Sequence, residues 1–202
     1  MADFNVFEMM LFTLWIYLPG FLVNTFAMMW GKWLPKTGYG PWPIDGGRMH
    51  KDGNRLLGDG KTWNGLIGGS LTSGLLCYLM TMVPENWIFI SPTEAATGWA
   101  ASAFVLGTFL GFTSLVGDST GSYFKRRKGM KREGDVSSKA PLLDTLPFAI
   151  SVFLFGQIFL TGSEHGDRDL IVPMLLLVVI TPILHRSFNL IGYKIGWKDV
   201  PY

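Results

Sequence analysis

Long apolar segments separated by charged loops constrain this chain more than any other feature of its sequence. Five segments hold almost no charge: 4–30, 64–83, 95–117, 142–162 and 170–192. A helix needs about 20 residues to cross the hydrocarbon core of a bilayer, and these segments are that long. Because backbone groups inside lipid must be satisfied within the segment, we expect each to be helical. The sequence predicts an all-α integral membrane protein, with five transmembrane helices in a single domain, 1–202.

The composition agrees with a membrane protein. Charged residues make up 16% of the 202 residues, whereas a soluble domain averages about 25%. The net charge of +2 is too small to indicate a nucleic-acid partner. The single cysteine, Cys77, lies in an apolar segment, which excludes a disulfide within the chain. The first apolar segment lacks the basic residues of a signal peptide and is too long for one, so we expect it to be retained.

The distribution of Lys and Arg predicts the orientation. The loop 31–63 carries six of these residues and the loop 118–141 carries seven. The loop 84–94 carries none, and 163–169 carries only Arg168. By the positive-inside rule, both long loops and the C-terminus are cytoplasmic and the N-terminus is outside.

The first long loop contains a run, Gly58-Asp59-Gly60-Lys61-Thr62, that is similar to a phosphate-binding loop. A P-loop requires a glycine at the position of Arg55 and a buried strand before it, and this chain has neither. The loop is nonetheless rich in glycine, with three Asp and six basic residues. That composition fits either an ordered phosphate or nucleotide surface or a plain solvated loop.

A polar face follows the third apolar segment. If the helix continues past Gly117, then Asp118, Ser122 and Lys125 lie at i, i+4 and i+7 on one face, beside Arg126. A carboxylate, a hydroxyl and two cations in this arrangement suit a metal-bound phosphate. The alternative is a juxtamembrane basic cluster that binds anionic lipid headgroups. That alternative applies equally well to three later cations, Lys128, Lys131 and Arg132.

Asp144 is an acid at the start of an otherwise apolar segment, directly after Pro141 and two leucines. Ionisable residues in membrane spans are costly and indicate function, although an interface carboxylate is the alternative. Asp118 and Asp144 flank the same cytoplasmic loop, so they can meet at one depth and share a divalent cation. Hard oxygen ligands favour Mg²⁺.

Several runs together resemble the CDP-archaeol synthase family, whose members are archaeal membrane cytidylyltransferases. The runs are DGNRLLGDGKTWNGLIGG (52–69), GDSTGSYFKRRKGMKREG (117–134), APLLDTLPF (140–148) and HRSFNLIGYKIGWKDVPY (185–202). The resemblance covers almost the whole chain. It implies five transmembrane helices in the cell membrane, with an active site at the cytoplasmic face that uses CTP and Mg²⁺. The implied lipid substrate is an unsaturated glycerol-ether phosphate, and pyrophosphate is the implied by-product.

The resemblance and the chemistry of the reaction together imply roles for individual residues. Asp118, Lys125 and Asp144 are the expected catalytic residues, and Asp118 and Asp144 the expected metal ligands. The expected substrate-binding residues are Asp59, Lys61, Thr62, Ser122, Arg126 and Lys131. The chain departs from the family pattern at two positions. Pro147 replaces a common second acid, and Asn64 replaces a common basic residue.

Two other functions are open on the sequence alone. A CDP-diacylglycerol synthase acting on phosphatidic acid shares the Lys-Thr-Trp-Asn-Gly run and the polar face that begins at Asp118, but has a Pro-Gly-His-Gly-Gly run that this chain lacks. A transporter or channel would place ionisable residues deep in the spans, along a pathway across the bilayer. Here the acids cluster at one face and the outer half is nearly uncharged.

Overall fold

The computed structural model of the chain describes residues 6–82, 100–130, 141–159 and 171–194. Over these residues the chain is helical, which confirms the predicted all-α class, and β pairing is limited to two isolated bridges in the first long loop. The elements are α1 (Val6–Ile16), α2 (Leu18–Trp33), the 3₁₀ helix η1 (Leu34–Thr37), α3 (Trp63–Met80), α5 (Ala100–Arg127), α6 (Pro141–Phe159) and α7 (Ile171–Lys194).

The first predicted span, 4–30, is not one continuous helix. α1 ends at Ile16, α2 begins at Leu18, and the two helices are bent by 44° relative to each other. Pro19 lies in the first turn of α2. Proline has no N–H to donate to the preceding turn, so it is tolerated where a helix begins and breaks one that would run through it.

The other predicted spans coincide with α3, α5, α6 and α7, with different ends. α5 continues past Gly117 to Arg127, so the first part of the predicted loop 118–141 is helical. Within the described ranges, one helix, Ala103–Arg127, is long and apolar enough by itself to cross a membrane. The bent pair of α1 and α2 passes the same test when it is taken as one span.

Close contacts between α2, α3 and α5 depend on small residues. A Cβ on Gly65 would lie 2.9 Å from the carbonyl oxygen of Ala27 on α2. A Cβ on Gly107 of α5 would lie 3.0 Å from the carbonyl oxygen of Ser73 on α3. Glycine lets these backbones approach, as is common between membrane helices. The three helices therefore hold one another at fixed distances.

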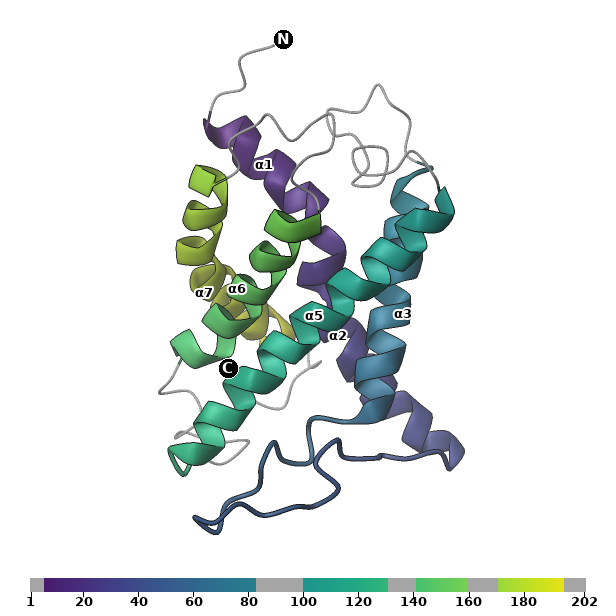
Figure 1. Ribbon diagram of the computed structural model, residues 1–202, viewed down its shortest axis with the longest axis vertical. Helices are drawn as coiled ribbons and strands as arrows, with labels where there is room; N and C mark the ends of the chain where they lie inside the picture. Colours follow the sequence, from purple (N-terminus) through teal and green to yellow (C-terminus); the bar gives the residue numbers. More distant parts are fainter. Residues whose placement is uncertain (1–5, 83–99, 131–140, 160–170, 195–202) are drawn as a thin grey trace.

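The remaining helices pack outward from this unit, α6 against α5 and α7 against α6 and α1 (Figure 1). The buried core lies between α1, α2, α5, α6 and α7 and includes Tyr17, whose ring meets Phe153 edge-on at 5.3 Å. The loop 38–62 lies across one end of the bundle, below the start of α3 and the C-terminal end of α5 (Figure 1). This end carries the loop residues and the last turns of α5 that the sequence singled out.

Candidate active site

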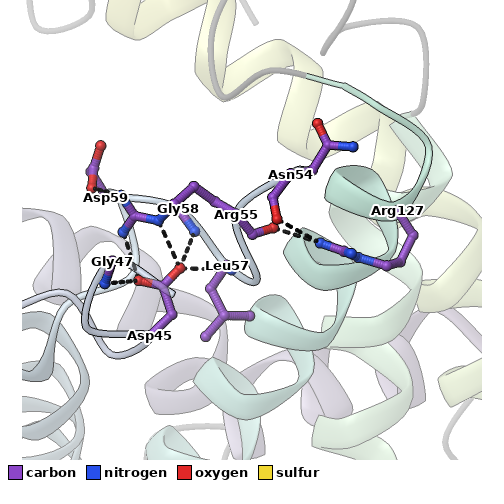
Figure 2. Close-up of polar contacts among 8 residues, drawn as sticks. All are labelled: Asp45, Gly47, Asn54, Arg55, Leu57, Gly58, Asp59 and Arg127. Carbon is purple, nitrogen blue, oxygen red and sulfur yellow. Dashed lines mark hydrogen bonds and ion pairs between the residues drawn. The ribbon is translucent and has the colours of Figure 1, made fainter. Parts of the chain in front are cut away.

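The loop 38–62 is organised around one buried carboxylate, Asp45, whose side chain is 1% exposed. Its oxygens accept hydrogen bonds from the backbone N–H groups of Gly47, Leu57 and Gly58 at 3.0–3.1 Å. Figure 2 shows these donors converging on Asp45 from separate parts of the loop, together with the guanidinium of Arg55. Burial alone raises the pKa of Asp45, but the bonds from Arg55 and the backbone outweigh it and hold the pKa well below its usual range. Asp45 is therefore ionised and fixes the loop.

Arg55 connects this centre to Asp59. Its Nη2 lies 2.6 Å from Oδ1 of Asp45, and its Nη1 lies 2.8 Å from Oδ1 of Asp59 (Figure 2). These partners raise the pKa of Arg55, and the hydrogen bonds that Arg55 donates to Asp45 contribute most. One guanidinium thus connects the buried carboxylate of Asp45 to the Gly58-Asp59-Gly60 turn.

Arg127, at the end of α5, attaches the loop to the helix bundle. Its Nη1 lies 2.7 Å from Oδ1 of Asp52, and its Nη2 donates to the carbonyl oxygen of Arg55 at 2.6 Å. Its guanidinium also lies over the ring of Tyr123, 5.2 Å from the centroid. These contacts join the loop to α5 at this end.

The end of the loop is joined to the start of α3. The N–H of Trp63 donates to the carbonyl oxygen of Trp42 at 2.9 Å, and Thr62 caps α3 by accepting from the N–H of Gly65 at 3.1 Å. The buried carboxamide of Asn64 donates to the carbonyl oxygen of Tyr39 at 3.1 Å. Asn64 therefore has a structural role in this chain. It occupies one of the two positions where the chain departs from the family pattern, in place of a common basic residue.

A pocket of about 400 Å³ opens between this loop and the helix ends. α2 lines it with Asn24, Ala27, Met28, Gly31 and Lys32; the loop and α3 with Pro41, Ile44, Asp59, Gly60, Lys61, Thr62, Gly65 and Leu66; and α5 with Leu115, Asp118 and Ser119. Four of the predicted site residues, Asp59, Lys61, Thr62 and Asp118, are thereby brought to one pocket. Its volume lies in the range of small-molecule sites.

An ion pair between Lys61 and Asp118 crosses this pocket. The Nζ of Lys61 contacts Oδ2 of Asp118, with side chains that are 22% and 18% exposed. Asp59 and Lys32 add one further charge of each sign to the lining. The sequence predicted separate ligands for Lys61 and Asp118, a phosphate and a metal ion. The structure places their charged ends together.

Three other predicted residues lie farther along α5 and do not line the pocket. Ser122 is buried one helical turn beyond Asp118, and Lys125 is half-buried. Arg126 is buried beside Gly58, where a Cβ would lie 3.3 Å from its Nε, and its Nη1 donates to the carbonyl oxygen of Met130. Arg126 thus contacts the turn that carries Asp59.

The two remaining predicted residues are Lys131 and Asp144. Lys131 and the side chain of Asp144 lie outside the described residues. The backbone of Asp144 belongs to the first turn of α6, and the neighbouring carbonyl of Leu143 lies directly against Gly121 of α5. Gly121 follows Asp118 by three residues, so the two acids belong to helix turns that lie close together.

Sequence reasoning missed three polar or charged residues of the pocket lining, Asn24, Lys32 and Ser119. In the sequence, Lys32 entered only the count of Lys and Arg residues that predicts the orientation of the chain in the membrane. Ser119 donates its hydroxyl to the carbonyl oxygen of Leu115 within its own helix. Asn24 carried a usable signal, because it is a carboxamide inside an apolar segment.

The pocket's donor set fits a phosphate-bound divalent cation. Among the described residues, no three His, Cys, Asp or Glu side chains are grouped closely enough to hold a metal by themselves. Mg²⁺ does not require such a group, because it is usually held by one or two carboxylates and by substrate phosphates. Asp118 and Asp59 line the same pocket, and the carboxylate of Asp118 already has a cation, the Lys61 ammonium, against it.

Comparison with known proteins gives one consistent family. A family model described as CarS-like, CDP-archaeol synthase, matches residues 6–202. A CDP-archaeol synthase of Thermococcus gammatolerans is 36% identical over 193 residues, covering 96% of each chain. One of Picrophilus torridus is 36% identical over 200 residues, covering 96% of this chain and 97% of the relative.

A solved structure agrees with the sequence comparisons. It was published as structural insight into an intramembrane enzyme for archaeal membrane lipids biosynthesis. It superposes with a TM-score of 0.61 at 26% identity and covers 89% of this chain and 94% of that one. The helical arrangement described above is thus similar to that of an intramembrane enzyme.

Proposed function

Because the chain belongs to the CDP-archaeol synthase family, we propose that it transfers the cytidylyl group of CTP to a lipid phosphate. The proposed acceptor is 2,3-bis-O-geranylgeranyl-sn-glycerol 1-phosphate, and the products are CDP-archaeol and pyrophosphate. The observation that carries the proposal is the pocket where Lys61 and Asp118 meet at the polar end of an apolar bundle.

We propose that the bundle spans the cell membrane five times, with the bent pair α1–α2 as one span and α3, α5, α6 and α7 as the others. Large apolar side chains remain exposed on the outside of these helices, including Phe109, Ile150, Leu154, Val179 and Ile183. Soluble proteins rarely expose so much apolar surface, whereas lipid covers it at no cost. The Lys and Arg count supports a cytoplasmic position for the loop 38–62 and the pocket.

The reaction is a nucleotidyl transfer, a substitution at the α-phosphorus of CTP, and it needs no protein nucleophile. An oxygen of the lipid phosphate attacks the α-phosphorus of CTP, the bond from that phosphorus to the bridging oxygen of the β-phosphate breaks, and pyrophosphate leaves with that oxygen. The second pKa of a phosphate monoester is about 6, so the attacking oxygen is already deprotonated at neutral pH. A general base is therefore unnecessary. The task of the site is to hold two anions together in line and to stabilise the developing charge.

The pocket residues are suited to that task. Lys61 and Lys32 supply positive charge to the phosphates, and the hydroxyl of Thr62 is positioned to donate to a phosphate oxygen. Thr62 caps the N-terminal end of α3, and the N-terminal end of a helix also favours anions. Lys125, Arg126 and Lys131 belong to the same proposal as cations for the second phosphate group, with Ser122 as a hydroxyl ligand on the same face of α5.

We propose Asp118 and Asp144 as the carboxylates that hold Mg²⁺. When bound, the metal neutralises phosphate charge and aligns the phosphates for in-line displacement. For Asp118 to take that role, Lys61 must release the carboxylate and turn toward phosphate. In the ion pair the charges of the two residues balance each other within the pocket.

Pyrophosphate release tests the proposed function. Purified protein in detergent is supplied with CTP, Mg²⁺ and either the geranylgeranyl diether phosphate or a diacyl phosphatidic acid. We expect release to depend on the lipid and to favour the diether strongly. Equal or faster release with phosphatidic acid would assign the chain to diacylglycerol chemistry instead. If thermal unfolding shows that the protein is folded and neither lipid supports pyrophosphate release, both functions are rejected.

A further inference from the structure

The pocket extends from the loop into the apolar part of the bundle. The residues that α2 contributes, Asn24, Ala27, Met28, Gly31 and Lys32, lie at the spacing of a single helix face. Seven residues separate Asn24 from Gly31, which corresponds to about 10 Å along a helix axis. On the opposite wall, Leu115 lies one turn deeper than Asp118 and Ser119. The pocket thus has a polar end at the loop and an inner end at Asn24.

Asn24 is the one hydrogen-bonding side chain that we find at the inner end of the described lining. The residues around it in the lining are Ala27, Met28, Leu66 and Leu115. Its side chain is half-buried, and the structure gives it no hydrogen-bond partner among the residues it describes. A carboxamide in apolar surroundings is unfavourable unless something pairs with it, so a ligand group is the natural partner.

We propose that the Asn24 carboxamide donates a hydrogen bond to an ether oxygen of the lipid's glycerol. This inference rests on the proposed function, and it assigns the inner end of the pocket to the lipid. With the lipid phosphate beside Lys61 and Asp118, its glycerol lies about one helical turn, 5.4 Å, deeper. Ether oxygens only accept hydrogen bonds, and the carboxamide N–H is the donor they require.

The chemistry of the two substrates favours the lipid at this end. CTP carries its charge on the triphosphate and comes from water. It is therefore best solvated and neutralised at the polar end of the pocket, which holds Asp59, Lys61 and Lys32. The inner end has apolar walls, and Met28 of α2, one turn from Asn24 in the lining, is partly exposed. Only a ligand with a weakly polar centre and apolar chains satisfies both Asn24 and those walls.

The test separates lipid binding from turnover. Asn24→Leu removes both the donor and the acceptor, and Asn24→Asp keeps the shape but loses the N–H. Thr25→Val, on the exposed side of the same helix, is the matched control. Binding of the diether phosphate without CTP is measured on detergent-purified protein. KM is then measured separately for the lipid and for CTP, and thermal unfolding shows that each variant is folded.

We expect both Asn24 variants to weaken lipid binding and raise the lipid KM by about tenfold, the effect of one buried hydrogen bond. The KM for CTP and the Thr25→Val variant should stay within about twofold of wild type. A raised KM for CTP with unchanged lipid binding would place Asn24 on the nucleotide and overturn the inference. Unchanged binding of both would also overturn it. Failure of the wild type to release pyrophosphate would reject the proposed function, while the binding comparison would still decide the role of Asn24.

Discussion

At the scale of single residues, the ion pair between Lys61 and Asp118 is the feature that matters most. The two residues are 57 positions apart, on a loop and on a helix, and their side chains are mostly shielded from water. A half-buried pair of this kind is screened less by salt than a surface pair. Any divalent cation that binds Asp118 must therefore compete with an ammonium group of this same chain.

This competition predicts that Lys61→Met tightens metal binding while it lowers turnover. Removing the ammonium frees the Asp118 carboxylate, so affinity for Mn²⁺, a spectroscopically visible substitute for Mg²⁺, should rise by about tenfold in the absence of CTP. Turnover should fall, because a cation is lost from the phosphate site. Electron paramagnetic resonance of free Mn²⁺ measures the affinity directly.

Lys32→Met is the matched control, because it removes one positive charge from the same pocket without removing the partner of Asp118. Its effect on Mn²⁺ affinity should be clearly smaller. If Lys61→Met leaves Mn²⁺ affinity unchanged or lowers it, Lys61 and the metal do not share Asp118.

At the scale of structural elements, the loop 38–62 is held by its own polar contacts. Asp45 receives hydrogen bonds from three backbone N–H groups and from Arg55, and each bond to a charged group contributes about 1.5–3 kcal/mol. Arg127 adds the connection to α5. Asp59 and Lys61 therefore reach the pocket from a loop of fixed shape.

Asp45→Asn should loosen this loop. The amide nitrogen of asparagine would face N–H donors, and Arg55 would lose a charged partner. Trypsin should therefore cleave the variant after Lys51 and Arg55 at least about ten times faster than it cleaves the wild-type protein. Asp52→Asn is the control, because Asp52 is more exposed and surface ion pairs contribute only about 0–1 kcal/mol. Equal cleavage rates for the two variants would show that Asp45 does not organise the loop.

The same carboxylate predicts how the loop responds to pH. The pKa of Asp45 is lowered in the folded protein, so its contribution to stability is fully present above the ordinary value of about 3.9. That contribution is lost only as the pH falls below this value, toward the folded-state pKa. Cleavage of the wild-type loop by an acid-tolerant protease should therefore be flat from pH 7 to about pH 4.5 and rise only below it. An increase near pH 6 would contradict this assignment.

The helices could be predicted from sequence because each rests on a local apolar run, and the class was confirmed over the described residues. The break at Tyr17 was missed, although Pro19 was its visible cause. The loop's internal order was beyond sequence reasoning. It depends on Asp45 meeting backbone groups ten and more residues away, and no periodic pattern encodes that contact.

A second element-scale feature is the contact of α5 with α6 near Pro147. Proline has no N–H, so the carbonyl of Leu143 is left without its usual helical donor, and that carbonyl lies against Gly121. The proline thus accompanies a close helix contact beside the turn that carries Asp144. The position where the related family commonly has a second acid has a packing role in this chain.

At the scale of the whole molecule, the pocket lies where an apolar bundle meets its polar loop. The three helices that form it, α2, α3 and α5, are held together through glycine contacts such as Gly65 on Ala27 and Gly107 on Ser73. Under the proposed function, a nucleotide would reach a site at this boundary from water, and the lipid would reach it from the bilayer. The location of the site follows from the fold as much as from the residues.

The sequence indicated most of the charged residues of the described pocket, but it did not indicate which of them pair with one another. Local runs indicated Asp59, Lys61, Thr62 and Asp118, which the structure brings to one pocket. The pairing of Lys61 with Asp118 depends on how the loop folds onto α5, which no short motif reveals. Lys32 and Asn24 were missed because each is a single polar residue within or beside an apolar run.

Transfer of the α-phosphate of CTP tests the central claim most directly. Purified protein in detergent is incubated with CTP labelled at the α-phosphorus, Mg²⁺ and the diether phosphate, and label is counted in the organic phase. The account predicts that label enters the lipid with wild-type protein, and that Asp118→Asn lowers the rate by about 100-fold or more while remaining folded. Label that stays in the aqueous phase with wild-type protein, or enters the lipid at a normal rate with Asp118→Asn, would contradict the account.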